Sequence, residues 1–197
     1  MKINKAWIRL VIIIVASNFM ASFASSKEIA LGSTKAPVTL VEYGSLTCDY
    51  CIAFHNNILP RVKKHYIDAG TVRFIYRHFP TSKAATHAAV AAQCSGDKFY
   101  EMLDELYSTI PGWYQAEDRN GVFVKKAKSL GLNSEVFLSC LSDAKNLDDI
   151  VSQQLAARND VGVIGTPTFV INGYVVRGKK TFAQMKALIN EALDKEN

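Results

Sequence analysis

The sequence lacks several features that would point to particular classes of protein. It has no repeated segment, no low-complexity tract and no block of basic residues, so we expect no nucleic-acid partner. Beyond residue 24 it has no apolar stretch near the roughly 20 residues that a membrane-spanning helix needs. Cysteine is scarce, with four residues, and proline is scarce, with five. What remains is a chain of 197 residues with enough apolar content, 49%, for a substantial core.

The first 24 residues differ from the rest and predict a cleaved secretory signal. Three basic residues precede the apolar run Leu10–Ala16, and the small residues Ser22 and Ala24 follow it. The alternative is an uncleaved membrane anchor, but Ser17 and Asn18 interrupt the apolar stretch, which is short for a spanning helix. Removing the three basic residues lowers the formal charge from +5 to +2. We therefore expect an exported chain of about 170 residues.

The tetrapeptide Cys48-Asp49-Tyr50-Cys51 lies where a predicted strand gives way to a predicted helix. The run Val38–Tyr43 is β-branched and apolar, which is typical of a buried strand. Apolar residues then recur at helical spacing from Cys51 to Tyr66. A thiolate at a helix N-terminus is stabilised by unpaired N–H groups and by the positive end of the helix dipole. The pattern predicts a nucleophilic cysteine pair that exchanges disulfides with another protein.

Two other uses of Cys48 and Cys51 compete with thiol exchange. The pair could supply half of a zinc site, with His55 one helical turn after Cys51 as a further ligand. The remaining cysteines form no second closely spaced pair, so we expect no metal. A purely structural Cys48–Cys51 bridge is disfavoured, because closing so short a loop contributes little stability.

The other two cysteines, Cys94 and Cys140, also lie in the exported part of the chain. An oxidising compartment favours disulfides, and once Cys48 pairs with Cys51 these two are left for each other. Closing their loop would stabilise the fold by roughly 4 kcal/mol, less any strain. The alternative is a pair of buried free thiols.

Strands are expected at four places, and the last two are joined by the Asn172-Gly173 dipeptide, a strong hairpin signal. The predicted strands are Val38–Tyr43, Val72–Arg77, Thr168–Ile171 and Tyr174–Arg177.

Helices are expected between the second and third strands and after the fourth. The predicted helices are Ala84–Cys94, Phe99–Thr109, Val122–Leu130, Val136–Leu141, Leu147–Arg158 and Thr181–Leu193. Asn133 and Asn146 are expected to cap two of them, and Pro111–Gly121 is expected to be irregular. Pro60 falls inside the helix that follows the cysteine pair and should kink it.

These elements predict an α/β fold whose sheet is interrupted in sequence by a helical domain. The two halves must combine, because neither has enough strands alone. We place the first half at 27–81, the inserted helical domain at 82–162 and the second half at 163–197, with the signal at 1–24.

The chain resembles the thioredoxin superfamily and, within it, the DsbA-type thiol–disulfide oxidoreductases of the bacterial cell envelope. The inserted helical domain separates this type from plain thioredoxins, and Cys94 and Cys140 resemble the second cysteine pair of one subgroup. The resemblance covers about Leu31 to Leu193 and rests on these segments: Val41-Glu42-Tyr43, Cys48-x-x-Cys51-x-x-Phe54, Leu59-Pro60, Val72–Arg77, Gly165–Phe169 and Asn172-Gly173.

The resemblance implies a thioredoxin fold, a mixed sheet flanked by helices, and a role for each site residue. Cys48 would attack the substrate, and the buried Cys51 would resolve the mixed disulfide. Pro167 matches a cis-proline beside the disulfide, leaving the backbone of Thr166 to pair with an extended substrate. Glu42 matches a buried acid that exchanges a proton with Cys51. Strand periodicity alone does not decide whether Glu42 is buried or exposed.

The resemblance further implies a periplasmic protein. We expect no cofactor, and we expect a monomer because no appended dimerisation segment is visible. It would introduce disulfides into reduced exported proteins and be recharged by a membrane-bound, quinone-linked partner of the DsbB type. The alternatives are a disulfide reductase or isomerase on the same fold, and a periplasmic chaperone that does not use its thiols.

One departure from the family pattern concerns the two residues between the cysteines. Strong oxidants of this type carry Pro-His there, whereas this chain has Asp49-Tyr50. The carboxylate of Asp49 should oppose a thiolate at Cys48 and raise its pKa. A less stabilised thiolate makes a less oxidising disulfide, so we expect a weaker oxidase than the strongest members of the family.

Overall fold

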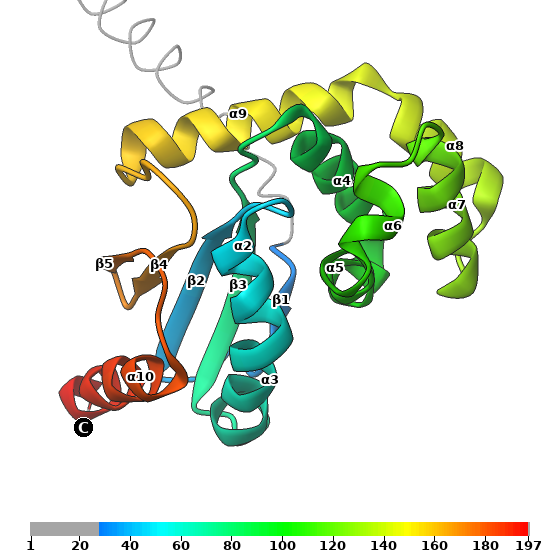
Figure 1. The fold of residues 1–197 in the computed structure, drawn as a ribbon. Helices are drawn as coiled ribbons and strands as arrows, with labels where there is room; N and C mark the ends of the chain where they lie inside the picture. Colours follow the sequence, from blue (N-terminus) through cyan, green and yellow to red (C-terminus); the bar gives the residue numbers. More distant parts are fainter. Residues whose placement is uncertain (1–27, 197) are drawn as a thin grey trace, which may run out of the picture.

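The computed structural model describes residues 28–196, so the predicted signal at 1–24 lies outside the described residues. A mixed sheet of five strands forms its centre, in the order β1-β3-β2-β4-β5 (Figure 1). The strands are β1 Ala30–Leu31, β2 Val38–Gly44, β3 Val72–His78, β4 Thr168–Ile171 and β5 Tyr174–Arg177. β2 and β3 are parallel, and the other neighbours are antiparallel. All four predicted strands are present, whereas β1 is too short to show a periodic pattern in the sequence.

The hairpin between β4 and β5 turns at the predicted dipeptide. Asn172 and Gly173 have positive φ angles of 43° and 87°, as a tight turn with this twist requires. The side chain of Asn172 accepts a hydrogen bond from the backbone N–H of Thr39 at 2.7 Å. The turn therefore ties the second half of the chain to β2.

The helix that follows the cysteine pair changes its winding along its length. It runs as α2 Asp49–Ala53, the π-helical segment η2 Phe54–Ile58, α3 Leu59–Val62 and a second π-helical segment η3 Lys63–Ile67. Pro60 has no backbone N–H to donate, and it lies at the start of α3, directly after the first π-helical segment. The kink predicted at Pro60 stays a prediction, and the structure shows a widened π-helical turn directly before α3.

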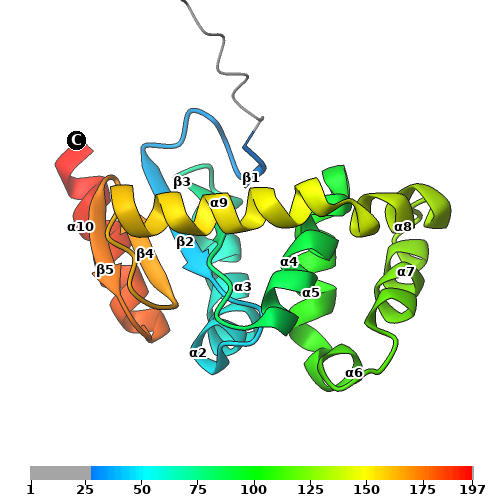
Figure 2. The same cartoon turned by 90° about the horizontal axis from the view of Figure 1, so that it is seen from above.

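Six α-helices and one short 3₁₀ turn lie between β3 and β4. They are α4 Lys83–Cys94, η4 Gly96–Lys98, α5 Phe99–Ser108, α6 Ile110–Tyr114, α7 Arg119–Ser129, α8 Ser134–Ser142 and α9 Ala144–Asp160. Helices α4 to α8 form the right-hand side of the molecule in Figure 1, and α9 runs along the top to the left-hand side. The long helix α9 leads from this group back across the sheet to β4 (Figure 2). The exact boundaries of a separate helical domain remain a prediction.

Two details of these helices differ from the sequence-based expectation. The segment expected to be irregular contains α6, which starts with Pro111 in its first turn and is anchored by Trp113. The indole N–H of Trp113 is fully buried and donates to the carbonyl of Leu106 at 2.8 Å. Helix α9 begins earlier than predicted, because Asp143 rather than Asn146 caps it by accepting from the N–H of Lys145.

Residues that alternate along β2 face two different parts of the core. Leu40 packs in the main hydrophobic cluster, which runs without a break from the sheet into helices α4 to α8. Val41 and Tyr43 belong to a smaller cluster on the opposite side of the sheet, where α9 contributes Ala157. Because both faces of β2 are covered, its sequence is apolar on both sides rather than alternating.

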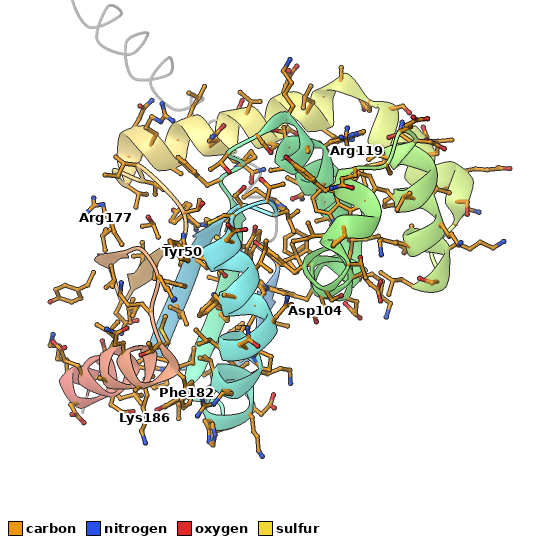
Figure 3. The ribbon with its side chains drawn as sticks, viewed as in Figure 1. Tyr50, Asp104, Arg119, Arg177, Phe182 and Lys186 are labelled. Atoms are coloured by element: carbon orange, nitrogen blue, oxygen red, sulfur yellow. A yellow bond between two sulfur atoms is a disulfide. The ribbon has the colours of Figure 1, made fainter. Side chains whose placement is uncertain are left out.

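The last helix, α10 Phe182–Glu196, packs against the sheet beside α3. Its first residue, Phe182, lies under the guanidinium group of Arg61, with 3.8 Å between the central carbon and the ring centre (Figure 3). Within residues 28–196 no helix has the length and apolar character needed to cross a bilayer.

Candidate active site

Cys48 and Cys51 lie at the start of α2, directly beyond the carboxyl end of β2. Cys48 is the N-cap residue, with an extended backbone, and Cys51 is in the first turn of the helix. Both are free thiols in this structure. Cys48 is partly exposed, whereas Cys51 is fully buried in the main core. The predicted arrangement of an accessible and a buried sulfur at a helix start is therefore present.

The thiol of Cys48 is acidic. Its pKa falls from the ordinary 9.0 to about 5, chiefly because the side chain of Cys51 donates a hydrogen bond to its thiolate. The side chain of Thr166 and the backbone N–H groups of Cys51 and Tyr50 also favour the thiolate, against the opposing effect of partial burial. At neutral pH Cys48 is therefore largely a thiolate.

Asp49, which the sequence suggested would oppose the Cys48 thiolate, is not among the main causes of this shift in pKa. Its side chain is exposed to solvent at the start of the helix. Water and salt screen a charge in that position far more than they screen the buried donors around the sulfur.

Cys51 has the opposite tendency. Burial raises its pKa strongly, its hydrogen bond to Cys48 raises it further, and the negative charge of Glu42 adds to both effects. The two sulfurs, only three residues apart, are thus held in different protonation states: thiolate at Cys48 and thiol at Cys51.

The segment before β4 reaches the same place from the other end of the chain. The Thr166–Pro167 peptide bond is cis, the isomer that the family resemblance implied. The thiol of Cys48 donates to the backbone carbonyl of Thr166, with 3.3 Å between sulfur and oxygen. Residues separated by 118 positions therefore form one site, because β4 pairs with β2 in the sheet.

Glu42 lies on β2 and is completely buried, which settles the question that strand periodicity left open. Its Oε2 is 2.8 Å from the Nε2 of His55, and both side chains are at most 1% exposed. Burial raises the pKa of Glu42, and the neighbouring His55 offsets part of that rise. An acid with a raised pKa therefore lies in the core close enough to affect the charge of both cysteines.

His55 is the residue at this site to which the sequence assigned no chemical role. It was considered only as a further zinc ligand beside Cys48 and Cys51, but its Nε2 is bonded to Glu42 instead. Within residues 28–196 no three His, Cys, Asp or Glu side chains come together as a metal site would require. The signal in the sequence was its position four residues after the buried Cys51, which places both on one face of the helix.

The second cysteine pair is bonded. A disulfide joins Cys94, the last residue of α4, to Cys140 in α8, with 5.8 Å between their Cα atoms. The amide group of Asn146 donates to the carbonyl of Cys140 at 2.8 Å and holds the start of α9 against it. The Cys94–Cys140 disulfide links two of the helices between β3 and β4, and it does not reach the site of Cys48 and Cys51.

A profile of the family described as "Thioredoxin" matches residues 24–191, which is most of the chain. The chain belongs to the thioredoxin family. The predicted thioredoxin fold, a mixed sheet flanked by helices with further helices inserted, is thereby confirmed.

Two solved structures show which branch of the thioredoxin family this protein is similar to. The crystal structure of α-DsbA1 from Wolbachia pipientis is 29% identical, has a TM-score of 0.79 and covers 87% of this chain and 93% of its own. That of oxidised BdbD from Bacillus subtilis is 25% identical, has a TM-score of 0.73 and covers 85% of this chain and 93% of its own. The thioredoxin-family protein is therefore DsbA-like.

A curated relative from Rickettsia felis carries the provisional name of protein-disulfide oxidoreductase. It is 28% identical over 171 residues, which is 86% of this chain and 61% of the relative. This thioredoxin-family chain thus spans about three fifths of the length of that relative.

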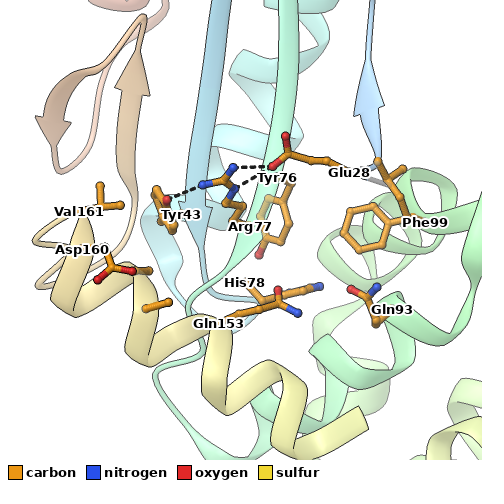
Figure 4. Close-up of a pocket in the computed structure, with 13 residues that line it drawn as sticks. Glu28, Tyr43, Tyr76, Arg77, His78, Gln93, Phe99, Gln153, Asp160 and Val161 are labelled. Carbon is orange, nitrogen blue, oxygen red and sulfur yellow. Dashed lines mark hydrogen bonds and ion pairs between the residues drawn. The ribbon is translucent and has the colours of Figure 1, made fainter. Parts of the chain in front are cut away.

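A cavity of about 590 Å³ lies apart from the cysteines, between the end of β3 and helix α9 (Figure 4). Tyr43 and Arg77 form one side of it, and Arg77 bridges the hydroxyl of Tyr43 to the carboxylate of Glu28. His78 lies on another side and is neutral, because burial lowers its pKa to about 3. None of the four cysteines lines this cavity, so the thiol chemistry belongs to a separate face of the thioredoxin-family fold.

Proposed function

We propose that this protein is a protein disulfide oxidoreductase, a dithiol oxidase that introduces disulfides into exported proteins. The single observation that carries the proposal is the contrast between Cys48, whose pKa is lowered to about 5, and Cys51, whose pKa is raised. A stabilised Cys48 thiolate favours the reduced form of the protein, which makes the Cys48–Cys51 disulfide a good oxidant. DsbA-like neighbours with the same fold support this direction of exchange.

The exchange takes place in two attacks. A substrate thiolate attacks Cys48 Sγ, the Cys48–Cys51 bond breaks, and Cys51 leaves and takes up a proton. A second thiolate of the substrate then attacks the substrate sulfur of the mixed disulfide, and Cys48 leaves as a thiolate. The substrate loses two electrons and forms a disulfide, and the protein gains them as a dithiol. Of the two protons from the substrate thiols, one is balanced by the proton on Cys51 and the other stays in solvent.

The other site residues assist these attacks. Thr166 favours the Cys48 thiolate, and its backbone, beside Pro167, pairs with an extended substrate strand. Glu42 supplies the proton that Cys51 takes up and accepts it again on reoxidation. Cys94–Cys140 is a structural disulfide that takes no part in exchange.

The proposed partners are those that the family resemblance implies. The substrates are reduced exported proteins, and the reduced protein is returned to its disulfide form by a membrane-bound, quinone-linked partner of the DsbB type. We place it in the periplasm as a monomer, exported by the signal at residues 1–24.

The reduction potential of Cys48–Cys51 tests the proposal. The purified protein is equilibrated with glutathione buffers and its free thiols are counted, with Cys94→Ala/Cys140→Ala as a control that leaves one pair. A pKa of about 5 lies between about 7 for thioredoxin and about 3.5 for DsbA, so we expect a potential between about −270 mV and about −120 mV. A value at or below the thioredoxin end would contradict the oxidase role and favour a reductase.

A further inference from the structure

The buried pair of Glu42 and His55 has no function in the exchange described above beyond the proton carried by Glu42. Its members come from different elements, β2 and η2, and meet through one contact of 2.8 Å between Oε2 and Nε2. Glu42 is inaccessible to solvent and the side chain of His55 is 1% exposed. Two titratable groups are therefore joined in the core, where an isolated charge would be costly.

The other polar atoms of the pair have no hydrogen-bond partner among residues 28–196. Oε1 of Glu42 and Nδ1 of His55 are buried without a hydrogen bond within the described part of the chain. The imidazole ring is held by stacking on Tyr107, with 4.0 Å between ring centres and 18° between planes, and by an edge contact with Tyr76 at 5.4 Å. The ring is thus fixed in orientation, and it makes a polar contact with the carboxyl group of Glu42, whose charge acts on Cys51.

We propose that His55 is a positioning residue that holds Glu42 and tunes it as the proton donor and acceptor for Cys51. The inference rests on the proposed function. A lone carboxyl in this core would keep its proton, because nothing would stabilise the carboxylate after the proton left. His55 donates from Nε2 to that carboxylate, so Glu42 gives up a proton to the leaving Cys51 and accepts one when Cys51 must become a nucleophile again.

Several charged and titratable groups face the pair and would contribute to its pH dependence. Cys48 and Cys51 approach from the start of α2, Tyr76 from β3, and Tyr107 from α5. Asp104, labelled in Figure 3, also lies on α5. Burial raises the pKa of both tyrosines, so they remain neutral. Burial also raises the pKa of Asp104, which is coupled electrostatically to His55. The tyrosines cannot change charge near neutral pH, which leaves Glu42, Asp104 and the thiols as the groups that respond.

The step that isolates this role is attack of Cys51 on a mixed disulfide between Cys48 and glutathione. Cys51 gives its proton to Glu42 and its thiolate bonds to Cys48. The bond to glutathione breaks, and glutathione leaves as a thiolate that is protonated by solvent. The release rate should rise with pH through one midpoint, the titration of Glu42. In His55→Leu the midpoint should move to higher pH, and the rate below it should fall about tenfold for each unit moved. His55→Gln keeps a donor and should move the midpoint less.

Matched variants distinguish an effect of His55 on Glu42 from a general disturbance of the helix. His65→Leu changes an exposed histidine in the same helical run and should leave the midpoint in place. Glu42→Gln should remove the midpoint, both alone and with His55→Leu. An unchanged midpoint in folded His55→Leu overturns the proposal. So does a shift in that variant that persists when Glu42 is also replaced.

A measurement on the unaltered protein covers the case in which His55→Leu does not fold. The ¹⁵N resonances of the His55 ring are followed with pH, with Glu42→Gln as the comparison. They should change over one pH interval in the unaltered protein and lose that change in Glu42→Gln. His55 resonances that titrate identically in both overturn the proposal. If the protein fails to exchange thiols at all, the proposed function fails, while these resonances still decide whether the pair is coupled.

Discussion

The two cysteine pairs of this protein are chemically alike but differ in loop length and in the polar groups around their sulfurs. Cys48 and Cys51 are three residues apart at a helix start, and the helix N–H groups, Thr166 and a buried carboxyl act on their charge. Cys94 and Cys140 are 46 residues apart and join two helices, and the amide group of Asn146 donates a hydrogen bond to the sulfur of Cys140. A disulfide that closes a short loop stabilises the fold little, whereas one that closes a long loop stabilises it by restricting the unfolded chain more. The comparison suggests that one pair is poised to be broken and the other to remain.

The largest expected difference between the two pairs is in the rate of disulfide transfer when each pair is removed separately. Cys48→Ser should lower the rate of disulfide transfer to a reduced peptide by about a thousandfold or more, because it removes the attacked sulfur. Cys94→Ala/Cys140→Ala should retain the rate within a few fold. The assay counts peptide thiols over time. Comparable losses in both would show that the second pair shares the chemistry.

For the free energy of unfolding we expect the reverse, with a larger effect from Cys94–Cys140 than from Cys48–Cys51. Cys94→Ala/Cys140→Ala should lower the free energy of unfolding by about 4 kcal/mol, since it opens a loop of 46 residues in the unfolded chain. Urea unfolding of the oxidised proteins measures it. Opening Cys48–Cys51 with a mild reductant in that double variant should not lower stability further. A large second loss would mean that the active pair also holds the fold together.

The charge of Cys48 offers a finer comparison. Thiolate absorbance should titrate with a midpoint near pH 5, well below the ordinary 9.0. Cys51→Ala should move that midpoint upward most, and Thr166→Val should move it upward less, in the order of their influence on the sulfur. Because folding lowers this pKa, the thiolate stabilises the reduced fold fully above about pH 9, and this contribution disappears as pH falls through about 5. Equal midpoints in all three proteins would refute the assignment of donors.

The smallest effect is expected at Asp49. Asp49→Asn should lower the pKa of Cys48 and raise the reduction potential, but by less than about 30 mV, because the carboxylate is exposed and screened. The glutathione equilibrium measures this shift at low and at high salt. A larger shift would return Asp49 to the role that the sequence suggested.

The sequence predicted the parts of this site that depend on local patterns. The strand before Cys48, the helix that starts there and the hairpin at Asn172 all follow from periodicity and turn chemistry. The burial of Glu42 did not follow, because β2 is covered on both faces and no alternation distinguishes them.

Contacts between distant segments were also beyond reach. His55 meets a partner 13 residues earlier on another element, so its role depends on how the helix packs on the sheet. Helix α6 was missed because Pro111, Gly112 and Trp113 have weak intrinsic helix preference, and burial of the Trp113 ring outweighs it. The caps show the same limit, since Asp143 and Asn146 are both suitable residues and only the packing of α9 decides between them.

Thr166 contacts Cys48 although 118 residues separate them in the sequence, so the site is completed late when the chain is synthesised. A chain that emerges from its N-terminal end presents both active thiols long before the segment that completes their surroundings has appeared. Until β4 takes its place beside β2, Cys48 lacks the hydrogen-bond donor of the Thr166 side chain and is a less acidic thiol. The most reactive sulfur of the protein therefore reaches its full acidity only once almost the whole chain is present, which limits its reactions with unintended partners during synthesis.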